Sequence, residues 1–243
     1  MSESPEIKAL LVEAERRGLA AVKAGRLWPA TPSEVEDVRV FLNDTRPNDK
    51  GIFFNKQEQL DDPPIADQVF DSNSQLVSTI QRVSRNNSAV ASTNFTQASF
   101  RENAQGEYRR TKNLISRLRA LWLDCDIRPG ERGKYKTYSE ALDHLSDFDE
   151  ATGLSADYVI DSGSGLHVYY SLGSDLTHDT WTPIAKDLKL ALKSFGIAAD
   201  YGVTVSGNQP LRLPYSLNLK QNRPPKLVHF LQPQGFRLKG VKK

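Results

Sequence analysis

The chain has 243 residues, of which 38% are hydrophobic and 26% charged, the composition of a globular protein with a sizeable core. The net charge of +2 hides an asymmetry: the residues from Tyr201 onward include eight basic side chains and no acidic one, so the first 200 carry −6. One cysteine, Cys125, excludes an internal disulfide framework and a Cys-rich zinc site, and no apolar run approaches the roughly 20 residues that span a bilayer. The opening residues lack the order of a signal peptide, so we expect a cytoplasmic protein without a membrane partner.

The first third of the chain is predicted to form helices with short strands between them. Apolar residues repeat at helical spacing over 5–24, and Gly25 ends the pattern. Thr31-Pro32-Ser33-Glu34 is a capping box with proline at the first helical position, which predicts a helix to about residue 43. The other elements expected here are a strand at 51–54, a loop at 61–64, a helix at 74–85 and a strand at 89–93.

The rest of the chain alternates strands, hairpins and helices. A polar segment at 94–108, expected to be an exposed loop, precedes a strand at 119–127. Ser162-Gly163-Ser164-Gly165 separates two apolar runs, at 157–161 and 166–172, and predicts a β-hairpin. The remaining expected elements are a turn-rich loop at 128–133, a helix from the capping box at 137–140 to about 152, a helix at 177–195 capped by Gly196, and short strands at 197–200, 210–213 and 226–231.

This order of elements predicts an α+β fold. Helices and strands are mixed, and regular strand–helix–strand winding is missing from the pattern. We therefore expect mixed, largely antiparallel sheets with flanking helices. The sequence has no internal repeat and no linker long enough to separate independent domains.

The most informative stretch, residues 119–127, places Asp124 and Asp126 two positions apart in a strand. Side chains at such positions share one face and lie about 6.6 Å apart. Two carboxylates that close repel each other unless a cation lies between them, and a divalent metal held by oxygen ligands is the simplest such cation. The same pattern also occurs on solvated strand edges without a metal, so the pair alone leaves both interpretations open.

Three further segments bear on this pair. Ser164 and His167 lie on a Gly-rich turn and the strand after it, where backbone and side-chain donors can approach a phosphate. Asp200 would add a third carboxylate, as a site for two metal ions requires. Arg212 and Lys220 are cations that suit triphosphate oxygens. Taken singly, each segment has an ordinary structural explanation: a hairpin turn, a strand end and a basic strand.

Basic residues flank the acidic pair and indicate a polyanionic partner. One cluster precedes Asp124, and the other is the C-terminal segment. Such blocks suit nucleic acid or a nucleoside triphosphate, although a basic tail that is only solvated fits equally well. The expected nucleic-acid contacts are Arg109, Arg110, Lys112 and Arg223.

Taken in order, these motifs resemble those of the archaeo-eukaryotic primase superfamily. Asp-x-Asp after an apolar strand, Ser-x-x-His, a later Asp and Arg-x-Pro-x-Ser-Leu-x-x-Lys are similar to the primase-polymerases of phages and mobile elements, and they cover roughly residues 89–231. The resemblance implies an RRM-like palm at 89–243 and an N-terminal α/β unit at 1–88, together one catalytic domain. The abrupt Lys-Gly-Val-Lys-Lys end leads us to expect a domain excised from a longer chain with a helicase or helical accessory domain.

The resemblance also implies roles for individual residues. It implies two Mg²⁺ or Mn²⁺ ions, with the carboxylate ligands Asp124, Asp126 and Asp200. It implies triphosphate contacts from Ser164, His167, Arg212 and Lys220, and a nucleotide-binding position at Asn218. Two features depart from the cellular primases: Asn218 stands where they have histidine, and no Cys/His zinc element is present.

Together these features predict template-directed nucleotidyl transfer on single-stranded or primed DNA by a two-metal mechanism. A metal-dependent nuclease is the alternative enzyme, because an Asp-rich two-metal site also serves hydrolysis. A non-catalytic replication-initiator or nucleic-acid-binding module is the third interpretation. A Ser/His/Asp hydrolase is disfavoured, because Gly163-Ser164-Gly165 leads into a strand and not into a helix.

Overall fold

The computed structural model describes residues 2–26, 28–56, 68–86, 92–220 and 223–231, and it is a mixed α+β fold, as expected. The helices are α1 (Pro5–Lys23), α2 (Pro32–Thr45), α3 (Asn73–Asn86), α4 (Tyr138–Thr152), α5 (His178–Phe195) and α6 (Tyr201–Thr204), with a short 3₁₀ helix at Lys112–Leu114. The strands are β1 (Gly51–Lys56), β2 (Gln68–Phe70), β3 (Ser92–Thr96), β4 (Ser99–Phe100), β5 (Ile115–Asp126), β6 (Tyr158–Asp161), β7 (Gly165–Thr177), β8 (Pro210–Arg212), β9 (Leu217–Asn218), β10 (Lys226–Leu227) and β11 (His229–Phe230).

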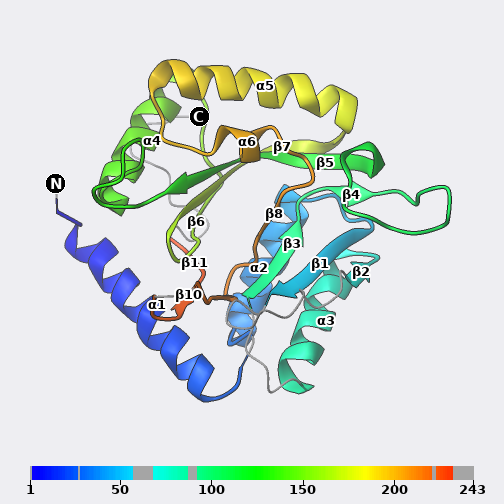
Figure 1. The fold of residues 1–243 in the computed structure, drawn as a ribbon, viewed down its shortest axis with the longest axis horizontal. Helices are drawn as coiled ribbons and strands as arrows, with labels where there is room; N and C mark the ends of the chain where they lie inside the picture. The colour runs from blue at the N-terminus through cyan, green and yellow to red at the C-terminus, as the bar shows by residue number, and fades with distance from the viewer. Residues whose placement is uncertain (1, 27, 57–67, 87–91, 221–222, 232–243) are drawn as a thin grey trace.

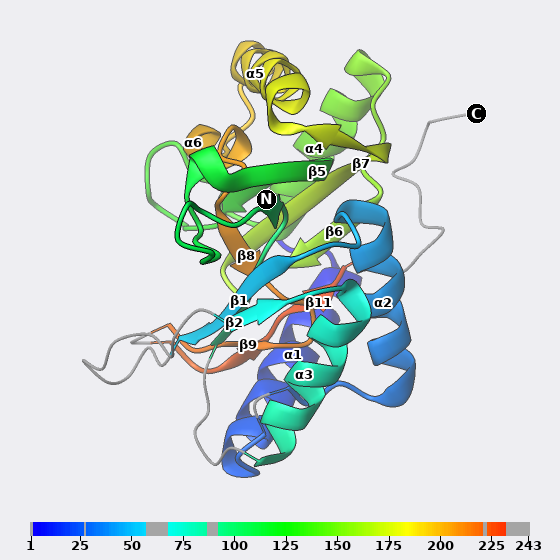
Figure 2. The same cartoon turned by 90° about the vertical axis from the view of Figure 1, so that its right-hand side faces the viewer.

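The strands form two main sheets and one two-stranded ladder. The larger sheet has the order β11-β6-β7-β5-β4, the smaller one β2-β1-β3-β8, and β9 pairs with β10. Pairing between these named strands is antiparallel throughout the described residues. In Figure 1, α4 and α5 lie above the five-stranded sheet, while the smaller sheet, α2 and α3 lie below it. Figure 2 shows the same layers from the side, with α1, α2 and α3 together at the lower end.

Local capping signals explain where several helices begin and end. Thr31 and Glu34 form the expected reciprocal capping box at α2, and Gly196 ends α5 in the left-handed conformation with φ 81°. Thr137 accepts a hydrogen bond from the Glu140 amide at α4. The first amides of α4 have a partner that the sequence did not indicate, because the Glu3 carboxylate accepts from them across the molecule.

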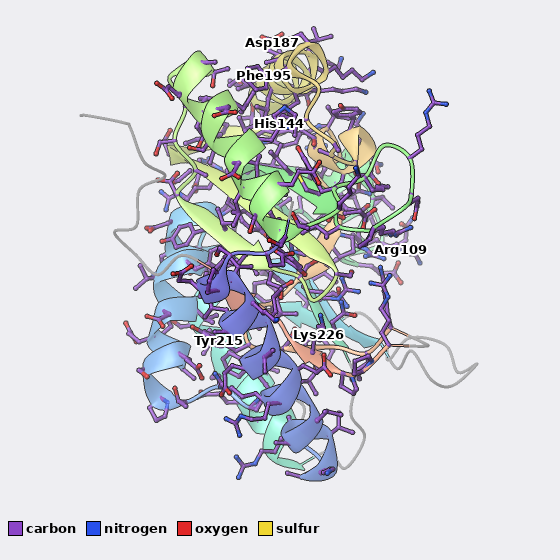
Figure 3. The ribbon with its side chains drawn as sticks, turned by 90° about the vertical axis from the view of Figure 1, so that its left-hand side faces the viewer. Arg109, His144, Asp187, Phe195, Tyr215 and Lys226 are labelled. Carbon is purple, nitrogen blue, oxygen red and sulfur yellow. The ribbon has the colours of Figure 1, made fainter. Side chains whose placement is uncertain are left out.

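Aromatic side chains join the two sheets into one core. Phe41 of α2 makes edge-to-face contacts with Phe95 of the smaller sheet and with Tyr158, Tyr169 and Phe230 of the larger sheet, at centroid distances of 5.0–6.2 Å. Such contacts add about 0.5–1.5 kcal/mol each beyond the area they bury. On the other side of the larger sheet, α4 packs on α5, where His144 and Phe195 lie 5.5 Å apart between ring centroids (Figure 3).

A buried arginine connects the loops beside the smaller sheet. The guanidinium of Arg46 is fully buried and donates to the carbonyls of Pro47, Asp49 and Thr96 and to the side-chain oxygen of Asn73. Burial lowers its pKa to about 9, so the group is still charged at neutral pH. Because this buried guanidinium bonds to four residues, it fixes the positions of the chain segments around it.

Some expected boundaries were wrong. The segment 94–108 is not an exposed loop throughout, because β3 continues to Thr96 and β4 follows, both buried. Thr96 is polar but buried, and its hydroxyl exchanges hydrogen bonds with the backbone of Ile52. Residues 197–200 form no strand: the chain turns there, and Asp200 caps α6. The strand expected at 226–231 is broken into β10 and β11, whereas β2, β4 and β9 were not predicted, because two- or three-residue strands show no periodicity.

Other expectations fall partly or wholly outside the described residues. The loop at 61–64 lies outside them, as does the start of the strand expected at 89–93, whose described part begins at Ser92. The division at residue 88 remains a prediction, although β1 and β2 share one sheet with β3 and β8 from the later part of the chain. None of the helices described here is long and apolar enough to cross a membrane.

Candidate active site

The pairing of β5 with β7 brings the Asp pair together with His167. Asp124 lies opposite His167 and Asp126 opposite Gly165 in the antiparallel ladder, so the three side chains share one face of the sheet. The distance between His167 Nε2 and Asp124 Oδ1 is 3.8 Å. The predicted association of these residues is thus present in the structure.

Strand β5 holds the carboxylates on a rigid support. Leu121, Leu123, Cys125 and Ile127 are all buried on one side of the strand. On the other side Trp122 is buried too: it is 0% exposed, stacks on Trp181 and donates to the carbonyl of Val203. The carboxylates therefore extend from the end of a strand that is packed on both faces.

The two carboxylates have different electrostatic environments. Asp124 keeps 30% of its side chain exposed, but burial and the neighbouring Asp126 raise its pKa to about 6. Burial also opposes ionisation of Asp126, yet the hydrogen bond from Lys134, 2.7 Å long, and the nearby Arg128 outweigh it and lower the pKa. Asp124 is thus a carboxylate whose charge the surrounding protein does not balance.

Lys134 and Arg128 are site residues that the sequence analysis missed. Arg128 begins the segment 128–133, which was predicted only as a turn-rich loop, and Lys134 directly follows this segment. The closeness of both basic residues to Asp126 in the sequence was the available signal. The parallel bridge between Ile127 and Tyr135 folds this loop back, so that Lys134 reaches Asp126.

Asp200 lies beside the pair, but it precedes helix α6 and does not end a strand as had been expected. Its backbone amide donates to the carbonyl of Asp124 over 2.7 Å, which holds the two residues together. Its Oδ1 accepts from the amides of Gly202 and Val203 and so caps α6. Its charge contributes to the raised pKa of Asp124, which places the third carboxylate near the first.

Arg212 belongs to the smaller sheet, and Lys220 follows the two-stranded ladder of β9 and β10. Arg212 lies on β8 opposite Asn94, and Lys220 follows β9. Both cations act on the ionisation of Asp124, and burial together with Arg212 lowers the pKa of Lys220. The residues that carry positive and negative charge in the predicted site are therefore within electrostatic reach of one another.

His167 and Ser164 are buried parts of the site wall. His167 is 2% exposed; burial and Arg212 lower its pKa to about 3, so its ring is neutral at physiological pH. Its Nδ1 is buried and finds no hydrogen-bond partner among the residues described. Ser164 is 7% exposed in a turn whose Gly163 has φ +87°, a conformation that favours glycine. Contact of either residue with a triphosphate remains a prediction.

Asn218 connects the Ser162–Gly165 turn to Lys220. It is 4% exposed, its Nδ2 donates to the carbonyl of Ser162 over 2.7 Å, and its Oδ1 accepts from the amide of Lys220 over 3.2 Å. These bonds fix both segments relative to each other. They give Asn218 a positioning role, beside the predicted nucleotide contact, which no observation tests.

Replacing Asn218 by aspartate is expected to lower the free energy of unfolding by about 1–3 kcal/mol. The acceptor for Lys220 is kept, but the donor to Ser162 is lost and a buried carboxylate faces a carbonyl. Urea or thermal unfolding of Asn218→Asp measures the loss. Asn208→Asp, in the loop before β8, is the matched control, because it removes a longer and only partly buried bond to the carbonyl of Arg110 and should lose less; equal losses in both variants would contradict the positioning role of Asn218.

A second buried cluster supports the same turn. Asp161, at the end of β6, accepts from the amide of Gly163 and from the hydroxyl of Tyr138, each over 2.7 Å, and lies 3.8 Å from His229. Burial raises the pKa of Asp161, and His229 opposes that shift. No sequence pattern indicated this cluster, because its members come from β6, α4 and β11.

The predicted nucleic-acid residues come from two segments of the chain that are far apart in sequence. Arg109, Arg110 and Lys112 lie in the connection between β4 and β5, where Arg109 is at the edge of the molecule and pairs with Glu107 (Figure 3). Arg223 is exposed and acts electrostatically on Tyr138. The basic residues of the C-terminal segment beyond residue 231 lie outside the described residues.

Cavities of about 460 and 430 Å³ lie away from the carboxylates. The larger is beside Trp28 and the end of α1, and the smaller is at the start of α5. The candidate site is therefore defined by its charged residues and not by either of these cavities.

The donor set of the site suits a hard divalent cation. Carboxylate oxygens are the ligands that Mg²⁺ and Mn²⁺ prefer, and the unbalanced charge of Asp124 beside Asp126 would be relieved by a cation. Among the described residues, no three His, Cys, Asp or Glu side chains are already arranged to hold a metal ion. Asp124 and Asp126 are thus the residues that fit such an ion, whereas the side chain of Asp200 caps α6 and does not complete a group of three ligands with them.

Comparison with known proteins gives a distant structural likeness only. No protein-family model matches the chain, and no curated protein matches it. Among solved structures, the chain resembles the polymerase domain of Mycobacterium tuberculosis ligase D in complex with DNA, with 17% sequence identity, coverage of 83% of each chain and a TM-score of 0.47. A likeness of this size assigns neither a family nor an activity to the chain.

Proposed function

We propose that this protein is a DNA-directed nucleotidyltransferase of the primase-polymerase type. The observation that carries the proposal is the association of Asp124 and Asp126 on one strand face with Arg212 and Lys220, which come from other elements. Carboxylates that hold cations, placed beside cations that hold phosphates, are the arrangement that transfer from a triphosphate requires.

Each residue has a distinct task in the proposed site. Asp124 and Asp126 would hold the divalent ions, with Asp200 as the third ligand; these ions supply charge neutralisation at the triphosphate and activation of the 3′-hydroxyl. Arg212 would bind phosphate oxygens as a planar fork and Lys220 as a point charge. Catalysis then depends on positioning and electrostatics, without a covalent enzyme intermediate.

The buried histidine would contribute as a neutral donor. The imidazole of His167 is uncharged at pH 7 because of its burial, so it can donate one N–H while the other nitrogen accepts. Since 2% of its surface is exposed and its Nδ1 is buried, only a small part of the ring is accessible to a ligand. The proposed partners are nucleoside triphosphates and single-stranded or primed DNA, with basic residues tracking the DNA backbone.

One assay tests the proposal against its alternatives. Labelled single-stranded and primed DNA are incubated with Mg²⁺ or Mn²⁺, with NTPs, with dNTPs or without nucleotide. Extended products that depend on the template are the expected result. Shortened products without nucleotide would identify a nuclease instead, and unchanged DNA that still binds the protein would identify a non-catalytic nucleic-acid-binding module.

Replacing Lys220 or His167 by alanine is expected to raise the KM for nucleotide about 10-fold or more, with a smaller effect on DNA binding. A charge-assisted hydrogen bond to phosphate is worth about 1.5–3 kcal/mol, and each 1.4 kcal/mol is tenfold in affinity. Primer extension at varied nucleotide concentration measures the effect. Lys186→Ala, on an exposed part of α5, is the control; an unchanged KM would remove the residue concerned from the triphosphate site.

A further inference from the structure

The smaller cavity, of about 430 Å³, lies where β4, β5 and α5 meet. All of its lining residues except Ile115 have polar or charged side chains: Arg101, Lys112, Asn113, Ser116, Thr177, His178 and Asp179. None of them belongs to the carboxylate site. In Figure 1, this junction lies at the right-hand end of β5 and α5, whereas the C-terminal end of β5 points to the left.

Strand pairing brings these residues together from three parts of the chain. Arg117 pairs with both Ser99 of β4 and Thr177 of β7, so the end of β4 and the start of α5 lie on either side of β5. The Arg101 amide donates to the carbonyl of Leu114 over 2.9 Å, which holds Arg101 beside the 3₁₀ helix that carries Lys112. The strand pairing therefore holds the residues that line the cavity in place.

The lining suits a phosphate group. No ion pair involves Arg101 or Lys112 within the described ranges, and the Arg101 guanidinium donates to the carbonyl of Asn113 over 2.9 Å. His178 also lines the cavity, but its Nε2 atom is buried and therefore not accessible to a ligand. The Ser116 hydroxyl and the first amides of the 18-residue helix α5 add uncharged donors. Asp179 also lines the cavity, and its carboxylate would oppose an anion.

The cavity lies far from the proposed site of chemistry along the same strand. Ile115 lines the cavity, and Asp124 is nine residues further along β5, or about 30 Å at about 3.3 Å per residue. Because β5 is packed on both faces, nucleic acid would have to pass over the protein surface between the two points; a DNA duplex advances about 3.4 Å per base pair, so it covers a distance of this size with about nine base pairs.

We propose that this cavity binds a backbone phosphate of the nucleic acid, about nine nucleotides from the carboxylates that act on its end. The spacing of about nine nucleotides rests on the proposed function, since that function places the reacting end of the nucleic acid at Asp124. The phosphate site itself rests on the cavity and its cations.

The first test measures binding alone, without nucleotide or divalent metal. The double variant Arg101→Ala/Lys112→Ala should weaken binding of a single-stranded oligonucleotide of about 30 nucleotides by about 10-fold or more, measured by fluorescence anisotropy. It should also reduce the slope of log affinity against log salt by about 0.7 for each phosphate that the variant no longer binds. Lys186→Ala/Lys189→Ala, which removes the same charge from α5, should leave this slope unchanged.

A variant that is expected to strengthen binding excludes loss of folding as the cause of the weaker binding. Asp179→Asn removes the repulsive carboxylate and should strengthen binding of the same oligonucleotide, with a steeper salt dependence. Weaker binding by Asp179→Asn, or equal slopes for both double variants, would overturn the phosphate site. Inorganic phosphate at the same ionic strength should displace little oligonucleotide; tight binding of inorganic phosphate that the double variant abolishes would make the cavity a free-anion site and overturn its assignment to nucleic acid.

The second test uses primer extension to measure the spacing between the cavity and the carboxylates. The KM of the Arg101→Ala/Lys112→Ala variant for primed DNA should rise for a duplex of about 15 base pairs and match the wild type for one of about 6, which ends before the cavity. The same KM increase at both lengths would refute the nine-nucleotide spacing. If no extension occurs with the wild type, the proposed function fails and the spacing with it, whereas the binding test still decides whether the cavity takes a backbone phosphate.

Discussion

Replacing Asp124 by asparagine is expected to lower the rate of nucleotide incorporation by about 10³-fold or more while the protein stays folded. A single preorganised donor at a reacting centre is worth about 10²–10³ in rate, and Asp124 would hold the ions on which all charge neutralisation depends. Primer extension measures the rate, and anisotropy should show DNA binding largely unchanged. Asp126→Asn should have an effect of the same order.

The stability of Asp124→Asn provides an independent check. Because the folded protein raises the pKa of Asp124 from 3.8 to about 6, the ionised form disfavours folding, and the penalty grows as the pH rises from about 4 to 6. In metal-free buffer the variant should therefore exceed the wild type in unfolding free energy at pH 7, and the difference should vanish near pH 4. Asp147→Asn, at an exposed position of α4, is the control; an active Asp124→Asn enzyme would refute the proposed mechanism.

Replacing Arg46 by alanine is expected to cost about 3–5 kcal/mol of unfolding free energy, enough to unfold a marginally stable chain. The variant leaves acceptors on Pro47, Asp49, Thr96 and Asn73 without their donor and opens a cavity below Phe70, whose ring lies 4.4 Å from the guanidinium carbon. Urea or guanidinium unfolding measures the loss.

Two further variants make this test specific. Arg46→Lys keeps the charge but not the planar set of five donors, so it should lose most of the same free energy. Arg16→Ala removes an arginine whose side chain is 67% exposed and whose partner is Glu13, and it should change stability by about 0.5 kcal/mol or less. If Arg46→Ala were as stable as Arg16→Ala, the guanidinium would not be holding these loops together.

Features with local signals were predictable from the sequence. The helix starts at Thr31 and Thr137 and the helix end at Gly196 follow from a few adjacent residues. The strand carrying Asp124 follows from its period-2 pattern, and so does the burial of Leu123. In these places propensity, pattern and capping agree, which is why sequence alone was sufficient.

Features set by distant residues were not predictable. Glu3 reaches the start of α4, Asn218 bonds to Ser162, and Trp122 is covered by Trp181, all through contacts that no periodicity encodes. Lys134 reaches Asp126 only because the loop after β5 folds back. The candidate site was thus predictable in its charged residues but not in the hydrogen bonds that position them.

The contacts of the Phe41 ring determine how the protein unfolds. Since it touches rings from both sheets, loss of either sheet exposes the aromatic surface of the other. A fragment beginning near residue 89 would lack Phe41 as well as β1, the neighbour of β3. The described chain should therefore melt in one cooperative transition, and its later part would not survive as an autonomous folding unit.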